Sequence, residues 1–332
     1  MTQIAQGSFK KKLLALAVLA PAMAITACSN DGAYVPGSGA DEKSGVAYDG
    51  YLRGAIVCAD VNLNKKCDDG EPSTTTMEGG LYVLSGLTPA QLLYPLALEA
   101  KAGVTIDEDT GNAIEDDFVY VAPADAKTVS GFSTIIQVET ERLIATGKTP
   151  TEAKAEAKAD LAAKLGAPAG TDLADFDAVA VSKANNSDSN FATQLRVVNQ
   201  VITKQLVSAV KSAPAGDASA VLAAATNKVT EKVATIKNLV DAKLAEGGVT
   251  GPDITGEQIG KITAETVEEP TAKPEVVSEQ DVNDAAEAVK KAQEAIKEAI
   301  EEEVEEQQPE PEEPATGGTG GTGGSNGGQG TN

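Results

Sequence analysis

The sequence predicts an α+β multidomain protein: a small N-terminal β-sandwich-like module, then an α-helical bundle, with a disordered linker and C-terminal tail. Two patterns carry this prediction. Short apolar runs separated by Gly, Pro and Asp fill residues 48–122, as in a strand-rich domain. Residues 127–246 instead repeat apolar residues at helical spacing. Aromatic residues make up only 3% of the chain and Trp is absent, so only small aliphatic cores are expected.

Residues 1–27 have the organisation of a secretory signal peptide, because three consecutive Lys residues precede an apolar stretch that ends in small residues before Cys28. The segment ITAC, which ends at Cys28, resembles the bacterial lipobox. The resemblance implies that Cys28 carries acyl chains such as palmitate and anchors the chain in a membrane. Since Ser29 rather than Asp follows Cys28, it also implies the cell outer membrane, on a face that the sequence leaves open. The alternative is an ordinary signal peptidase site with an incidental cysteine.

The first domain begins after a flexible tether, residues 28–47, which is rich in Gly, Ser and Asp. Within residues 48–122 the strand candidates are YLRGAIVCAD, GGLYVLSGL, PLALEA and FVYVAP, and the segment TIDEDTGNAI carries turn signals. About seventy residues suffice for one small sandwich of short strands.

Four helices are expected in residues 127–246, which form the bundle. Their ranges are 132–147, 149–166, 188–212 and 217–246. The second is the best defined, because Thr149, Pro150 and Glu152 form a capping box with Pro at the first helical position, and Gly166 stops the helix. The last has one apolar face along its whole length.

The rest of the chain is predicted as a linker over residues 247–277, an acidic helix over 278–306 and a disordered tail over 307–332. Gly, Pro and Thr dominate the linker, and the tail is rich in Pro and Glu, then in Gly. The acidic helix has Ser278 as N-cap and a thin stripe in which Val282, Val289 and Ile296 alternate with Ala. This stripe fits docking on the bundle or pairing with another helix.

Charge and composition exclude several classes of function. The net charge is −23, which argues against nucleic-acid binding. The chain has no His, so Ser–His–Asp and Cys–His catalysis and His-ligated zinc are excluded. With three Cys, a four-ligand structural zinc site is excluded as well. Many carboxylates are present, but without Trp and with few other aromatics no sugar-binding platform is evident, so we expect no enzyme activity.

The segment VCADVNLNKKCDDGEP, residues 57–72, has the spacing of a calcium loop. Counted from Asp60, side-chain oxygens recur at positions 1, 3, 5, 9 and 12, and position 7 supplies a backbone carbonyl, which matches the pattern of an EF-hand loop. The predicted Ca²⁺ ligands are therefore Asp60, Asn62, Asn64, Lys66, Asp68 and Glu71.

Two further features qualify this loop. Position 6 is Lys65, where an EF-hand has Gly in a left-handed turn, and a non-Gly residue is less favourable in that conformation. We therefore expect weak calcium binding, with a dissociation constant of roughly 10⁻⁴–10⁻³ M. If Cys28 carries lipid, Cys58 and Cys67 remain as a pair in an oxidising compartment, and a disulfide is predicted. The alternative to a calcium loop is an acidic turn stapled by the disulfide and free of metal.

Residues 48–90 resemble the B-type repeats of bacterial surface adhesins and the related prealbumin-like or carboxypeptidase-regulatory-like sandwiches. The resemblance rests on the D-x-N-x-N pattern from Asp60, on the D-x-G-E-P pattern from Asp68, and on Gly80 and Tyr82 before the second strand. It implies a calcium-stiffened, non-catalytic spacer in a surface protein.

The functional expectation is a non-catalytic, lipid-anchored cell-envelope surface protein used in adhesion or in matrix or surface assembly. The lipid on Cys28 would hold it at the membrane. The sequence leaves open whether it binds a protein or matrix partner and whether it self-associates in the presence of calcium. The alternative is an envelope lipoprotein whose helical domain binds a small ligand or a protein partner.

Overall fold

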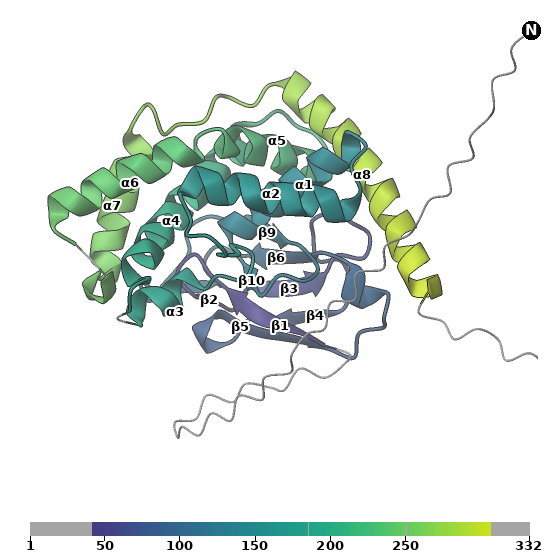
Figure 1. Cartoon of the computed structure of the whole chain (residues 1–332), viewed down its shortest axis with the longest axis horizontal. Coiled ribbons are helices and arrows are strands. Elements are labelled where there is room, and N and C mark those ends of the chain that lie inside the picture. The colour runs from purple at the N-terminus through teal and green to yellow at the C-terminus, as the bar shows by residue number, and fades with distance from the viewer. Residues whose placement is uncertain (1–41, 185, 250, 307–332) are drawn as a thin grey trace, which may run out of the picture. The chain divides into compact units, whose positions relative to one another are not determined.

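The computed structural model describes residues 42–184, 186–249 and 251–306, and these residues form a mixed α+β protein (Figure 1). Short strands occupy the N-terminal part, up to Val129, and α-helices follow from Gly131 to Glu306. The predicted α+β class is confirmed. The predicted signal peptide, the lipid site at Cys28, the first part of the tether and the tail from residue 307 lie outside the described residues. None of the described helices is long and apolar enough to cross a membrane.

The described strands are β1 (Glu42–Ala47), β2 (Leu52–Arg53), β3 (Ile56–Ala59), β4 (Ser73–Thr75), β5 (Leu81–Ser85), β6 (Leu96–Ala100), β7 (Ile106–Asp107), β8 (Asn112–Ala113), β9 (Phe118–Ala122) and β10 (Thr128–Val129). They form three small sheets. In the first, the order is β10-β1-β5, and β1 runs antiparallel to β5 and parallel to β10. The second is the antiparallel sheet β4-β3-β6-β9, and the third has the order β2-β7-β8.

Strand β1 lies in a segment that the sequence assigned to the tether. Its Gly- and Ser-containing composition has weak strand propensity, but it pairs over five residues with β5 and also with β10. Both partners are distant in the sequence, so tertiary pairing overrides the local preference. The tether therefore ends before residue 42 rather than at residue 47.

Eight α-helices and three short 3₁₀ turns lie in the described residues. The helices are α1 (Gly131–Ala145), α2 (Pro150–Leu165), α3 (Ala178–Lys183), α4 (Ser189–Ser212), α5 (Ala218–Thr230), α6 (Val233–Gly247), α7 (Gly256–Glu268) and α8 (Glu279–Glu306), and the turns are η1 (Glu78–Gly80), η2 (Gln91–Leu93) and η3 (Gly251–Asp253).

Helix α2 begins and ends where the sequence predicts. Thr149 Oγ1 accepts a hydrogen bond from the Glu152 amide, the Glu152 carboxylate accepts one from the Thr149 amide, and Pro150 is the first helical residue. Gly166 ends the helix with φ of 60°, a left-handed conformation that Gly adopts without steric cost. The capping prediction is confirmed.

Two expected segments differ in the structure. The helix predicted over 217–246 is two helices, α5 and α6, which meet at an exposed turn at Glu231. Its apolar face is nonetheless continuous, since Val229, Val233 and Ile236 on either side of the turn are all buried. The segment predicted as a linker, 247–277, contains α7, which opens with a capping box of Thr255 and Gln258 and buries one apolar face.

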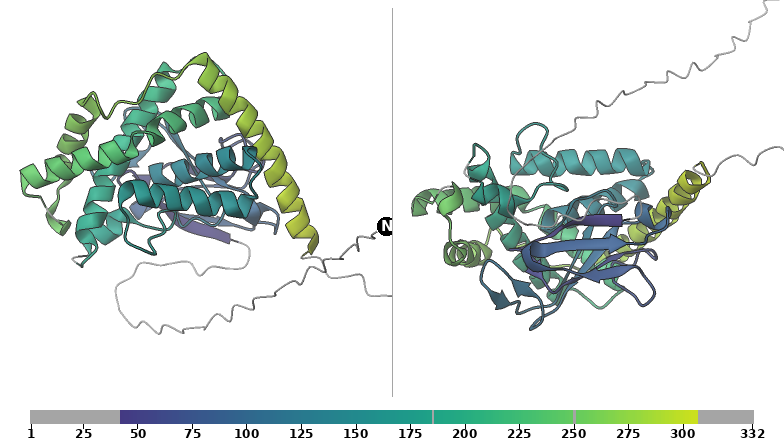
Figure 2. Two further views of the ribbon diagram at one scale, coloured as in Figure 1. Left: turned by 45° about the horizontal axis from the view of Figure 1, so that its top comes forward. Right: turned by 90° about the horizontal axis from the view of Figure 1, so that it is seen from below.

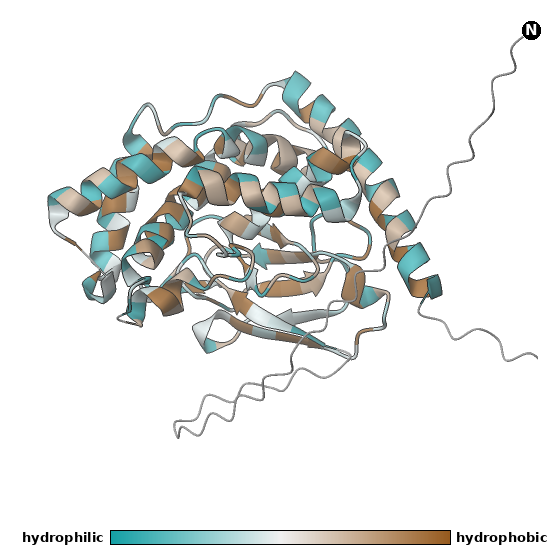
Figure 3. Cartoon of the chain, viewed as in Figure 1, coloured by the Kyte–Doolittle hydropathy of each residue, from teal (hydrophilic) through white to brown (hydrophobic). Residues whose placement is uncertain are grey.

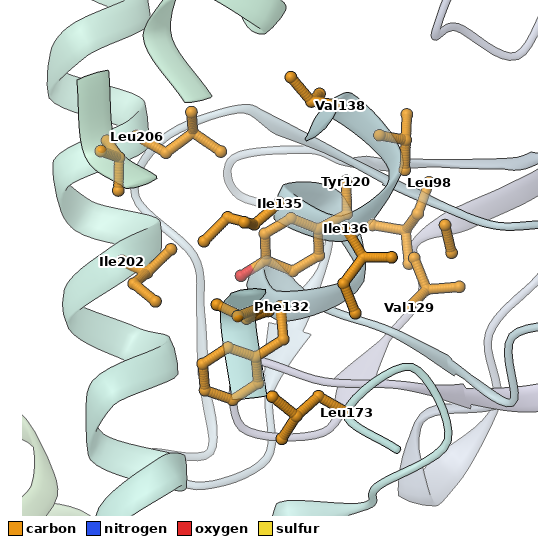
Figure 4. Close-up of a cluster of buried hydrophobic side chains, with 14 of the residues drawn as sticks. Leu98, Tyr120, Val129, Phe132, Ile135, Ile136, Val138, Leu173, Ile202 and Leu206 are labelled. Carbon is orange, nitrogen blue, oxygen red and sulfur yellow. The ribbon is translucent and has the colours of Figure 1, made fainter. Parts of the chain in front are cut away.

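The strands and helices share one hydrophobic core. Buried side chains of β6, β9 and β10 lie in the same cluster as those of α1 and α4, which Figure 4 shows around Tyr120 and Phe132. Helix α1 packs directly on β9. Residues 48–122 and 127–246, which the sequence predicts as separate domains, thus bury their apolar faces against each other. Because the chain has few aromatic residues, burying these two small apolar surfaces against each other removes more apolar area from water than two separate cores would.

Helix α8 packs along α1 and α5, beside the other helices (Figure 1, Figure 2). Its hydrophobic residues form a narrow stripe on an otherwise hydrophilic helix, as Figure 3 shows. Val282, Ala285, Val289 and Ala292 in this stripe are buried. Of the two options that the sequence left open for the acidic helix, the structure has the docked one.

Candidate metal loop

The candidate loop, residues 60–71, joins β3 to β4. Its two ends are held together by the ladder between these strands and by a hydrogen bond from the Ala59 amide to the Pro72 carbonyl, 3.0 Å. The Asp60 amide donates to the Pro95 carbonyl at 2.9 Å, next to β6. The sheet therefore fixes where the loop leaves and re-enters the fold.

Asp60, at position 1, is almost fully buried, with 3% of its surface exposed. Its Oδ1 accepts from the Asn64 amide at 2.9 Å and its Oδ2 accepts from the Lys65 amide at 2.8 Å. Burial raises the pKa of this carboxyl to about 6, although the two amide donors oppose the shift. The carboxylate thus organises the first half of the loop through the backbone.

The side chains at positions 3, 5 and 9 converge on one atom. Asn62 and Asn64 each donate from Nδ2 to Asp68 Oδ2, at 2.7 and 2.6 Å. These two hydrogen bonds lower the pKa of the Asp68 carboxyl. The amide oxygens of Asn62 and Asn64 accept backbone N–H groups of the loop at 3.0 and 2.9 Å. Three of the predicted ligands are therefore brought together.

Glu71, at position 12, closes the loop from its far end. Its Oε1 accepts from the amides of Val61 and Asn62, at 2.9 and 3.2 Å, and its Oε2 accepts from the Asp68 amide at 3.1 Å. The carboxylate therefore links the start of the loop to its end, which is the task that a bidentate Glu performs through the ion in an EF-hand loop.

The backbone of the loop has two left-handed residues, Leu63 with φ of 64° and Lys65 with φ of 62°, at positions 4 and 6. No other non-Gly residue in the described part of the chain has positive φ. The left-handed turn that an EF-hand makes with Gly at position 6 is thus present here with Lys65 in that place. Side chains in this region cost about 1–2 kcal/mol, so the loop conformation needs support from its surroundings.

That support comes from the helices. The Lys65 ammonium lies 2.6 Å from Glu141 Oε2 on α1, with both side chains largely buried, and Gln137 donates to the other Glu141 oxygen at 2.9 Å. The carbonyl of buried Leu63 accepts from Gln293 Nε2 of α8 at 2.7 Å. Sequence reasoning missed these contacts, because each partner lies 76 or more residues away and no spacing pattern marks it.

The predicted disulfide between Cys58 and Cys67 is confirmed, with Cα atoms 5.6 Å apart. It joins the end of β3 to position 8 of the loop. The Lys66 side chain is exposed, as expected for a residue that would offer only its carbonyl, and that oxygen lies 3.6 Å from Cys58 Sγ. The bridge shapes the loop without using a predicted ligand.

The donors of the loop fit calcium by their chemistry, because carboxylate, amide and carbonyl oxygens are the ligands of a hard cation. In the described residues no three Asp, Glu or Cys side chains are grouped so as to hold a metal ion. The loop carboxylates are occupied by its own N–H groups, so an ion would compete with the hydrogen bonds that Asn62, Asn64 and Asp68 make to one another. No family model, curated protein or solved structure matches this chain.

Proposed function

We propose that this chain is a non-catalytic, lipid-anchored protein of the bacterial cell envelope, in which Ca²⁺ held by residues 60–71 stiffens a β-sandwich-like module. The observation that carries the proposal is the shape of the loop. The side chains of Asn62, Asn64 and Asp68 meet within the loop. Left-handed residues stand at positions 4 and 6, and a disulfide and two helices hold the loop in place. The function is then mechanical, in adhesion or in matrix or surface assembly.

If the loop binds Ca²⁺, replacing the charged ligands Asp60 and Glu71 by their amides should remove this binding. Thermal unfolding of the chain from Ser29 onward, with calcium and with a chelator, measures this. Calcium should raise the midpoint in the unaltered chain but not in an Asp60→Asn, Glu71→Gln double variant, which keeps acceptor oxygens for the loop amides. Asp69→Ala is the matched control, since Asp69 is an exposed acid of the same loop outside the ligand pattern. No calcium-dependent shift at millimolar concentrations would leave the loop a disulfide-stapled turn.

The anchor in this proposal rests on the lipobox resemblance at Cys28. Expression of the full chain in a Gram-negative host should place it in the membrane fraction, and the Cys28→Ser variant should be released from that fraction. Mass spectrometry of the purified N-terminus checks the acyl chains directly. An unaltered chain that is soluble after export and carries no added mass would refute the anchor and leave the loop proposal untouched.

Self-association is the second property to test, because a chain of charge −23 needs cations to bring copies together. Light scattering across a calcium series measures it. A monomer at every calcium concentration would remove assembly from the proposed function and favour a partner of another kind.

A further inference from the structure

A pocket of about 510 Å³ lies between the β7–β8 hairpin, α4 and α7. Lys204 is the only base among the described residues that line it, against five acids. Part of the wall is apolar, formed by Phe118, Val207 and Val267. The volume is that of a small-molecule site, and the mixture of an apolar wall with a few fixed charges is typical of one. The lining acids are Asp49, Asp107, Glu115, Asp116 and Glu268.

The most firmly held of these acids is Asp49. Its Oδ1 accepts from Asn199 Nδ2 at 3.1 Å and from Thr203 Oγ1 at 2.7 Å, and the Tyr120 hydroxyl lies 3.3 Å from the same oxygen. All three partners are buried, with at most 2% of their surface exposed. Figure 4 shows the Tyr120 hydroxyl directed toward the helix that carries Ile202 and Leu206. The carboxylate is therefore fixed from β9 and α4.

The second oxygen of Asp49 is different. No described residue donates a hydrogen bond to Oδ2. This oxygen is also not fully buried, since the fully buried side-chain oxygens without a partner do not include it. It is therefore accessible where Asp49 lines the pocket. Within the described residues no salt bridge reaches Asp49 or Asp107, and none reaches Lys204. Asp49 Oδ2 therefore has no hydrogen-bond donor among the described residues. Lys204 is close enough to lower the pKa of Asp49, but it is one base against the five acids that line the pocket.

We propose that this pocket binds a small organic cation, an amine or guanidine with an apolar body, whose N–H groups donate to Asp49 Oδ2. The apolar body would lie on Phe118, Val207 and Val267, and Asp107 would add attraction for the positive charge. A bare metal ion fits less well, because the described residues hold no group of three carboxylates around one point. Burial raises the pKa of Asp49 to about 7, as expected for a carboxylate that no salt bridge of the described residues reaches.

The inference does not rest on the calcium loop, since none of the residues 60–71 lines this pocket. The pocket between the β7–β8 hairpin, α4 and α7 would have a function independent of the loop, so that failure of either proposal does not affect the other.

Isothermal titration calorimetry of the chain from Ser29 onward tests the proposal with phenethylamine and with hexylamine, and with 2-phenylethanol as the neutral match. The amines should bind, and the alcohol should bind at least about tenfold more weakly, because a charged hydrogen bond is lost. Asp49→Asn keeps an acceptor for the buried donors but removes the charge, and it should weaken amine binding by a similar factor.

A second variant fills the pocket without disturbing the fold. Gly260 of α7 lines the pocket, and a Cβ built there meets nothing within 4 Å, so Gly260→Leu should abolish amine binding while the unfolding midpoint is kept. Asp160→Asn, at an acid of α2 outside the pocket, is the control and should bind normally. Absence of amine binding, equal binding of amine and alcohol, or unchanged binding in both pocket variants would overturn the proposal. Displacement of the amine by calcium in the Asp60→Asn, Glu71→Gln variant would also overturn it, in favour of an inorganic cation.

Discussion

Lys65 and Glu141 form a buried ion pair that joins the candidate metal loop to helix α1, with Nζ and Oε2 2.6 Å apart. Their side chains are only 3% and 9% exposed. Lys65 is also the left-handed residue at position 6 of the loop. The residue that departs from the EF-hand pattern thus connects the loop to helix α1, while the Leu63 carbonyl connects it to helix α8. A Gly in its place would relax the backbone but lose this tie.

Loss of one partner of this pair should destabilise the fold strongly. Glu141→Leu leaves the Lys65 ammonium buried without a counter-ion, and we expect a loss of about 3 kcal/mol in the free energy of unfolding. Urea unfolding measures it. The double variant Lys65→Met, Glu141→Leu should recover much of the loss, because no buried charge is then unpaired. A double variant as unstable as the single one would show that the pair acts through packing rather than charge.

The disulfide should contribute a similar amount. Replacing both Cys58 and Cys67 by Ala opens a ring with a sequence separation of 9, and chain entropy alone predicts a loss of about 2–3 kcal/mol. Urea unfolding of the variant, compared with the unaltered chain with and without a reductant, checks this. If reductant lowers the stability of the variant as much as that of the unaltered chain, the effect does not come from this bridge.

Gln293 should hold the loop in place from helix α8. Its side chain donates to the Leu63 carbonyl at 2.7 Å, so Gln293→Ala leaves a half-buried acceptor without this partner and should cost about 1 kcal/mol. Hydrogen exchange should become faster at the loop amides of Asn64 and Lys65. Gln280→Ala, at an exposed residue of the same helix, is the control. Faster exchange along the whole chain in both variants would point to helix α8 itself instead.

Local signals in the sequence were sufficient for some elements. The Thr149 capping box and Gly166 set both ends of α2. The spacing from Asp60 to Glu71 marks a loop in which the side chains of Asn62, Asn64 and Asp68 contact one another. Helix α7 carries the same kind of signal, a capping box of Thr255 and Gln258, but the surrounding Gly and Pro residues concealed it.

Other features depend on partners that are remote in the sequence. Strand β1 owes its existence to β5 and β10, not to its own propensity. Arg196 of α4 pairs with Asp109, 87 residues earlier, and both side chains are buried. The Asp49 carboxylate is held by Asn199 and Thr203 of α4, which lie 150 and 154 residues later in the chain. No periodicity or spacing links such residues, so the pocket could not be anticipated.

The N-cap of α2 should be worth about 1 kcal/mol. Thr149→Ala removes the acceptor of the Glu152 amide, and the helix N-terminus then has one more unsatisfied N–H group. Thr151→Ala, two residues later on the same exposed turn, is the matched control and should be nearly neutral. Urea unfolding of the two variants distinguishes them, and equal losses would mean that the cap contributes nothing of its own.

Asp49 should make stability depend on pH in a definite direction. Burial raises its pKa to about 7, with a smaller contribution from Asp107 on β7, while Thr203 and Lys204 of α4 and the hydroxyl of Tyr120 oppose the shift. In the unfolded chain an Asp titrates near 4. Between about pH 4 and 7 the folded state therefore binds more protons than the unfolded state, and the free energy of unfolding falls as pH rises.

The comparison with Asp49→Asn isolates this effect, because the other acids, including Asp60, titrate in both proteins. From about pH 4 to about pH 7 the unaltered chain should lose about 1–3 kcal/mol relative to the variant, after allowance for the partial access of solvent to the pocket. Above that range the difference should stay constant. Urea unfolding of both proteins across this pH series measures it. A difference that does not change with pH would show that the Asp49 carboxyl is charged throughout, with a counter-charge that the pocket already supplies.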